Sequence, residues 1–321
     1  MLQKITHQLG VSLLDFMDLS VVLPVNKKSY SAEIRRSQPT AMVFLIDQSG
    51  SMSETMQGLG ESKATFLARA VNQTLRELVN ISTRTEGIRH YLDIVLIGYG
   101  GIGDGKTSSV CWQGALEGKT WVSVTELAAN PFTKEEITET KKIRNQEKTE
   151  TKTVKSWLTS RSVSQTPMGA AIEHATVLLS DWIAANPTSY PPTVFNFTDG
   201  AQSDCTDDEL LEKAKALKNL HTSDGNILFF NCHISTQDKK AIYFPLSRTE
   251  LPAGDKYAQL MYNLSSDMPA SYNLGVAGVR GSDIPTSGSF SAMVYQADDT
   301  ALVRMIDIGS RSQKTQIGKN K

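Results

Sequence analysis

Apolar and polar positions along the chain predict strands that alternate with helices. Residues 41–46 form an unbroken apolar run that ends in Asp47, as expected for a strand buried on both faces of a sheet. Further strands of this kind are predicted at residues 91–97, 193–198 and 226–232, with an edge strand at 241–246. Apolar residues at helical spacing predict helices over residues 61–81, 166–182, 207–220, 257–264 and 300–308. This alternation predicts an α/β fold: a doubly wound, Rossmann-like, mostly parallel sheet covered on both faces.

Two stretches interrupt this pattern. Residues 98–118 are rich in glycine and precede an alternating stretch at 120–124, so we expect a hairpin there. Residues 131–155 carry seven basic and five acidic residues and few apolar ones, which predicts an exposed helix or a flexible excursion. The resulting division is a leader at 1–38, one domain at 39–310 that contains the charged excursion 131–155, and a basic flexible tail at 311–321.

Composition and charge narrow the function classes. The chain has 321 residues, 40% of them hydrophobic and 21% charged, as in ordinary globular proteins, and its net charge of −1 gives no reason to expect nucleic acid or a membrane surface as partner. The three cysteines form no CxxC pair, which argues against a zinc site and a disulfide framework. Asp15 and Asp18 interrupt the apolar stretch near the N-terminus, and no run of about 18 apolar residues occurs, so we expect a cytoplasmic protein.

Polar residues stand where the predicted strands end. Asp47, Ser49 and Ser51 follow the first strand, and Asp199 ends the third. Thr166 is predicted as the N-cap of a helix that has Pro167 as its first residue. Because loops at the carboxyl ends of parallel strands converge on one edge of the sheet, we expect these side chains to meet.

The chemistry of these side chains suits Mg²⁺ or Mn²⁺, which prefer oxygen ligands. In an extended loop the side chains of Asp47, Ser49 and Ser51 point the same way, and Gly50 permits a sharp turn. Each residue alone also has an ordinary interpretation as a turn or cap residue. Their occurrence together, in this order and after buried strands, favours a metal site.

The pattern Asp47-x-Ser49-x-Ser51, with Thr166 and Asp199-Gly200, resembles the metal-ion-dependent adhesion site of von Willebrand factor A domains. The likeness spans roughly residues 38–310. It implies a doubly wound sheet with one antiparallel edge strand. It also implies that these five side chains ligate the ion, some through water, and that a partner protein's Asp or Glu fills the open coordination position.

Residues 297–310 are similar to the closing helix of bacterial intracellular tellurite-resistance proteins of the TerY type. That subfamily is associated with a serine/threonine kinase and a PP2C-type phosphatase. The resemblance implies a non-enzymatic, metal-dependent adaptor in a bacterial signalling or stress-response system.

A P-loop-type nucleotide-binding protein is the main alternative. Gly100-x4-Gly105-Lys106-Thr107 fits the phosphate-binding pattern and follows a buried strand. That pattern needs a helix directly after it, and residues 108–114 show no helical period, which favours a hairpin loop. A serine hydrolase is less favoured, since Ser49 lacks the G-x-S-x-G context and the five histidines show no partner pattern.

Overall fold

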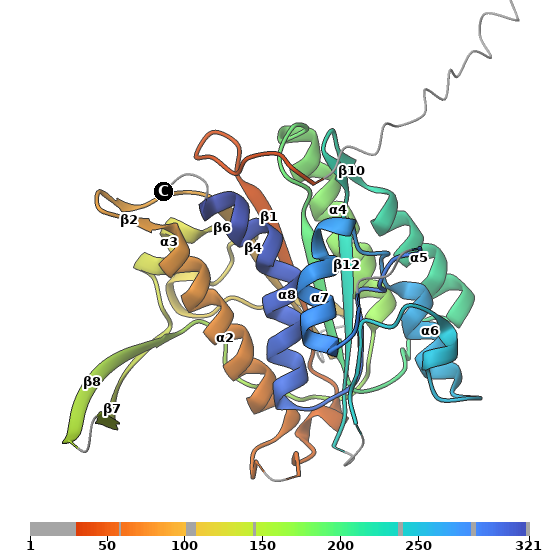
Figure 1. The fold of residues 1–321 in the computed structure, drawn as a ribbon, viewed down its shortest axis with the longest axis horizontal. Coiled ribbons are helices and arrows are strands. Elements are labelled where there is room, and N and C mark those ends of the chain that lie inside the picture. Colours follow the sequence, from red (N-terminus) through yellow and green to blue (C-terminus); the bar gives the residue numbers. More distant parts are fainter. Residues whose placement is uncertain are drawn as a thin grey trace, which may run out of the picture.

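The computed structural model describes residues 30–57, 59–100, 107–143, 146–236, 240–283 and 287–318. Its main feature is an eight-stranded sheet in the order β13-β14-β12-β9-β1-β4-β5, with β6 also paired to β4 (Figure 1). The strands are β1 (Thr40–Asp47), β4 (Leu92–Tyr99), β5 (Ser108–Val110), β6 (Val122–Ser123), β9 (Thr193–Thr198), β12 (Leu228–Ile234), β13 (Ile242–Tyr243) and β14 (Met293–Ala297).

The centre of the sheet is parallel and its edges are antiparallel. Strand β1 pairs in parallel with β4 and β9, and β12 pairs in parallel with β9 and β14. At one edge β13 runs antiparallel to β14, and at the other β5 and β6 run antiparallel to β4. The predicted α/β class is therefore confirmed, and antiparallel strands lie at both edges rather than one.

Helices cover both faces of the sheet. One layer packs on the even-numbered side chains of β1 and contains α2 (Lys63–Ser82), α3 (Val124–Ala129), α7 (Asn273–Arg280) and α8 (Asp299–Gly318). The other packs on the odd-numbered side chains and contains α4 (Met168–Ala185), α5 (Asp207–Asn219) and α6 (Lys256–Leu264). Thus Phe44 lies in the first layer, where it stacks on Phe195, and Val43 lies in the second. This two-sided burial explains the unbroken apolar run at 41–46.

The charged stretch 131–155 is neither a helix nor irregular, so that prediction was wrong. It forms a two-stranded antiparallel hairpin, β7 (Thr133–Ile143) and β8 (Gln146–Ser156), which projects from the body of the molecule (Figure 1). Threonines, which favour strands, stand between the charged residues of this stretch. A charge run indicates exposure, but it does not distinguish helix from strand.

Several boundaries differ from the predicted ones. Helix α4 begins at Met168, with Pro167 rather than Thr166 at the N-cap position, so the predicted capping role of Thr166 was wrong. Helix α8 extends to Gly318, into the predicted flexible tail. Strand β14 and helices α3 and α7 were not predicted. Two further pairings of two-residue strands complete the described strands: β2 (Thr83–Arg84) with β3 (Gly87–Ile88), and β10 (His221–Thr222) with β11 (Gly225–Asn226). The described 3-10 turns are η1 (Gly50–Ser53), η2 (Gly114–Leu116), η3 (Arg248–Glu250) and η4 (Ala270–Tyr272).

The end of the predicted leader packs on the domain. The backbone nitrogens of Ser31 and Ala32 donate to the carboxylate of Asp224 at 2.9 and 3.0 Å, respectively. The leader's residues 1–29 lie outside the described part of the chain. None of the helices in the described ranges is both long and apolar enough to cross a membrane.

Candidate functional site

The predicted site residues lie where the sheet reverses its winding. From β1 the chain passes through α2 to β4 on one side, and later through α4 to β9 on the other side of β1. The carboxyl ends of β1 and β9 are therefore neighbours whose following loops diverge, and such switch points form ligand crevices in α/β sheets. Asp47 is the last residue of β1, and Asp199 directly follows β9.

Asp47 is buried and organises the loop that follows it. One carboxylate oxygen accepts a hydrogen bond from the backbone nitrogen of Ser49 at 2.8 Å, and the other accepts one from the hydroxyl of Thr198 at 2.8 Å. Burial raises the pKa of Asp47 to about 6, although the hydrogen bonds from Ser49 and Thr198 oppose this rise. A nearby cation would stabilise the charged form of such a desolvated carboxylate.

The two serines connect this loop to Asp199. The hydroxyls of Ser49 and Ser51 lie 3.1 Å apart, and Ser51 donates to Asp199 Oδ1 at 2.7 Å. Ser49 is buried and Ser51 is exposed, so the group of oxygens reaches from the interior to the surface. The structure thus brings together four of the five predicted residues.

Thr166 lies on an adjacent loop that is tied to both sides of the site by backbone contacts. Its backbone nitrogen donates to Ser203 Oγ at 3.0 Å, and its carbonyl oxygen accepts from Ser203 N at 3.0 Å. Two residues earlier, the carbonyl oxygen of Ser164 accepts from Gly50 N at 3.2 Å. The hydrogen bonds described for Thr166 use its backbone, so its hydroxyl as a ligand remains a prediction.

Gly100, the first glycine of the P-loop pattern, and Gly98 in β4 both pack against Gln48 in the Asp47 loop. A Cβ on Gly98 would lie 2.6 Å from the side chain of Gln48, and one on Gly100 would lie 2.5 Å from the Gln48 carbonyl oxygen. Residues 101–106, which include Gly105 and Lys106, lie outside the described part of the chain. Strand β5 follows at Ser108, where a phosphate-binding loop requires a helix. Close packing against Gln48 therefore accounts for both described glycines.

Sequence reasoning missed a lysine at the site. Lys63 Nζ donates to Asp199 Oδ2 at 2.8 Å and to Glu54 Oε2 at 2.7 Å. Burial lowers the pKa of Lys63, but the hydrogen bonds and charges of Asp199 and Glu54 together raise it above its ordinary value. Its position was a usable signal, because a cation in the first turn of a helix opposes the helix dipole and needs an acidic partner.

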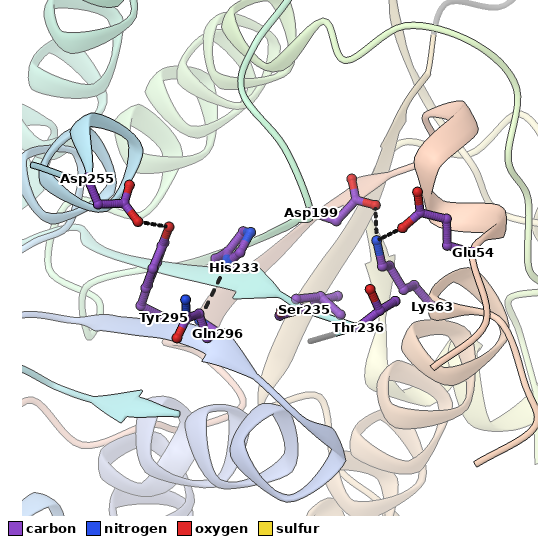
Figure 2. A pocket seen from close by; sticks show the side chains of 10 residues that line it. Glu54, Lys63, Asp199, His233, Ser235, Thr236, Asp255, Tyr295 and Gln296 are labelled. Carbon is purple, nitrogen blue, oxygen red and sulfur yellow. Dashed lines mark hydrogen bonds and ion pairs between the residues drawn. The ribbon is translucent and has the colours of Figure 1, made fainter. Parts of the chain in front are cut away.

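A polar cavity of about 340 Å³ opens beside Asp199, across the carboxyl ends of β12 and β14 (Figure 2). The ring of His233 stacks on Tyr295 at 4.6 Å, and its Nδ1 accepts from the backbone nitrogen of Gln296 at 3.3 Å. Burial lowers the pKa of His233 to about 4, so the ring is neutral at pH 7. At the far wall the Tyr295 hydroxyl donates to Asp255 Oδ2 at 2.8 Å. Gln296 has a φ of 55°, an uncommon left-handed conformation for a residue other than glycine.

The donor set suits a hard cation. In the described ranges no three His, Cys, Asp or Glu side chains gather to hold a metal ion. The side-chain donors that meet here are two carboxylates and two hydroxyls, from Asp47, Asp199, Ser49 and Ser51. An all-oxygen set of this kind matches the preference of Mg²⁺ and Mn²⁺, which commonly retain several waters.

No family model and no curated protein matches the sequence. Similar solved structures include the pilus adhesin SpaC from Lactobacillus rhamnosus GG, at 12% identity and a TM-score of 0.46 over 89% of this chain and 32% of that one. A von Willebrand factor type A protein from Catenulispora acidiphila has 10% identity and a TM-score of 0.40, over 86% and 43%. The vWF domain of the type V pili tip protein Mfa5 from Porphyromonas gingivalis has 10% and 0.39, over 88% and 96%. The chain thus spans less than half the length of the first two, and at these identities the likeness assigns no family.

Proposed function

We propose that the chain is a non-enzymatic protein-binding module of the von Willebrand factor A type, whose binding depends on a divalent cation. One observation carries the proposal: Ser49, Ser51 and Asp199 form a continuous group of oxygens, with contacts of 3.1 and 2.7 Å, beside the buried carboxylate of Asp47. This group lies at the switch point of the sheet, where α/β proteins bind ligands.

Asp47, Ser49, Ser51 and Asp199 would hold the ion, Mg²⁺ or Mn²⁺, with Thr166 as the fifth ligand residue. The ion, when bound, supplies a positive centre that attracts a carboxylate. The chain's own contribution is rigidity: Thr198 and the backbone of Ser49 fix the Asp47 carboxylate, and the exposed Ser51 marks the side open to a partner. The partner would contribute an Asp or Glu.

The wider setting of this proposal rests on the resemblance of residues 297–310 to TerY-type proteins. On that basis the module would act in the cytoplasm as an adaptor between a serine/threonine kinase and a PP2C-type phosphatase. Affinity capture of partners with Mg²⁺ and with EDTA, followed by mass spectrometry, tests this setting. Loss of the same partners from the Asp47→Ala protein is expected, and retention of them with EDTA contradicts it.

Direct titration with Mn²⁺, followed by the electron paramagnetic resonance signal of the free ion, tests the site itself. We expect the wild-type chain to bind the ion and Asp47→Asn and Ser51→Ala to bind it at least about tenfold more weakly, since each variant alters an oxygen donor. Asp208→Asn is the matched control, because Asp208 is an exposed carboxylate at the start of α5. Equal affinities for all four proteins would exclude this site.

A further inference from the structure

The ammonium group of Lys63 lies between two carboxylates at the rim of the polar cavity (Figure 2). Its side chain is only 5% exposed, and that of Asp199 is 0% exposed, whereas that of Glu54 is 59% exposed. The three side chains therefore differ in their exposure to solvent. Lys63 and Asp199 are enclosed by protein, and Glu54 faces solvent.

The position of Lys63 in the chain makes this enclosure informative. Lys63 is the first residue of α2, where the helix dipole is positive and a cation is disfavoured. A buried ammonium is also costly unless carboxylates compensate it. Asp199 and Glu54 supply that compensation, at 2.8 and 2.7 Å. The lysine is thus held beside the site against two unfavourable terms.

Asp199 has two roles that compete. Its Oδ1 accepts from Ser51, within the group of oxygens proposed to hold the ion, and its Oδ2 accepts from Lys63. A divalent ion on the Ser51 side and the ammonium on the other side would share one carboxylate. Like charges this close repel, and the enclosure of the Lys63 and Asp199 side chains limits how far solvent screens that repulsion.

We propose that Lys63 is a tethered cation that competes with the divalent ion for Asp199 and thereby sets the ion affinity of the site. The proposal rests on the proposed function. Without the ion, Lys63 neutralises the buried Asp199. When the ion binds, the Asp199 carboxylate interacts with the ion, and the ammonium group of Lys63 stays paired with the solvent-facing Glu54. The wild-type chain therefore binds the ion more weakly than a chain without the Lys63 charge, and Glu54 reduces this difference.

Titration of the full chain with Mn²⁺ alone tests the competition. Lys63→Met removes the charge and keeps much of the aliphatic stem, so we expect it to bind Mn²⁺ at least about tenfold more tightly than wild type. Lys63→Arg keeps the charge and is expected to bind within about threefold of wild type. Circular dichroism confirms folding of each variant, and Mn²⁺ should raise the melting temperature of Lys63→Met more than that of wild type.

Glu54→Gln provides a second, less disruptive variant, because Glu54 is largely exposed. With Glu54 neutral, Lys63 pairs with Asp199 alone, and we expect Mn²⁺ affinity to fall by at least about threefold. In the Lys63→Met background the same change should have no effect, since the competitor is gone. Glu61→Gln, on the same loop and paired with Arg69, is the matched control and should leave affinity unchanged.

The outcomes separate the two proposals. Mn²⁺ binding by wild type with equal or weaker binding by Lys63→Met overturns the competition and leaves the metal site standing. Equal weakening by Glu54→Gln in both backgrounds also overturns it, because the effect would then be general electrostatic attraction. No binding by any variant overturns the proposed metal site and the competition with it.

Discussion

The hydroxyl of Tyr99 donates to the side-chain oxygen of Asn196 at 2.7 Å, inside the sheet and next to the proposed site. The amide of Asn196 then donates to Asn231 at 3.0 Å, and Asn231 donates to Ser265 at 3.2 Å. These contacts join β4, β9, β12 and the end of α6 in one buried polar network. Such a network stabilises a fold only while each member has a partner.

Tyr99→Phe tests this network with little change of shape. Loss of the hydroxyl leaves the buried Asn196 oxygen without its donor, and we expect the free energy of unfolding to fall by about 1–3 kcal/mol. Urea denaturation measures the change. Tyr262→Phe is the control, because the Tyr262 hydroxyl forms only an exposed contact, and its effect should stay within about 0.5 kcal/mol. Equal effects of the two substitutions would show that the buried Tyr99 hydroxyl contributes no more to the free energy of unfolding than the exposed Tyr262 hydroxyl.

Gly100→Ala should disturb the Asp47 loop. The added Cβ would lie 2.5 Å from the carbonyl oxygen of Gln48, so the loop must shift, and we expect destabilisation by about 1–3 kcal/mol together with weaker Mn²⁺ binding. Gly278→Ala is the control, since nothing lies within 4 Å of its Cβ position on α7, and added helix propensity should stabilise by up to about 1 kcal/mol. Unchanged melting and ion affinity for Gly100→Ala would mean that the loop tolerates the side chain.

Glu126→Gln should reduce stability in a pH-dependent way. The contact with Lys119 and the hydrogen bonds from Ser123 lower the pKa of Glu126 to about 2. A lowered carboxyl pKa stabilises the folded state above the unfolded value of about 4.3, and this contribution is lost as the pH falls toward about 2. Thermal melting should therefore show a lower melting temperature for the variant at pH 7 and a smaller difference near pH 3. A difference that grows on acidification would contradict the stated cause.

The projecting hairpin β7–β8 should be dispensable for folding. It forms its own two-stranded sheet, and its register pairs join only its two strands. Replacing residues 136–153 by a short Gly-Ser turn should change the free energy of unfolding by less than about 1 kcal/mol, since an isolated ribbon is at best marginally stable.

The chain directly after β8 is held by Asn72 of α2, which accepts from Trp157 N at 2.7 Å and donates to Leu158 O at 2.7 Å. Asn72→Ala should lower the free energy of unfolding by more than the truncation of the hairpin does, as measured by urea denaturation. A larger loss on truncation would contradict the view that the hairpin is dispensable for folding.

The sequence predicted what depends on periodic burial. Strand β9 has the predicted bounds, and β1, β4 and α2 differ from prediction by one to two residues at each end. Each has a two-sided apolar run or an apolar helical stripe, which sequence periodicity records directly. Strand β14 was missed because it has only five residues, one of which is the polar Gln296, and because it follows a polar stretch.

The site was predictable in part. The carboxyl ends of parallel strands converge by topology, so Asp47, Ser51 and Asp199 could be brought together without coordinates. Lys63 was not predicted because its partners, Glu54 and Asp199, lie 9 and 136 residues away in the sequence. Only the fold reveals that both contact one ammonium group. The hairpin β7–β8 was wrongly predicted as an exposed helix or a flexible excursion. Its charges indicate exposure only, and the threonines between them were the local signal for a strand.

The contact between Thr198 and Asp47 joins residues 151 positions apart. Closing a contact over so many residues costs chain entropy, which the pairing of β1 with β9 offsets. The loops that follow β1 and β9 therefore meet only in molecules in which these two strands are paired. An ion held by both loops would bind only such molecules, and truncated or partly folded chains would not bind it. Protection by Mn²⁺ against proteolysis would then distinguish folded chains from partly folded ones.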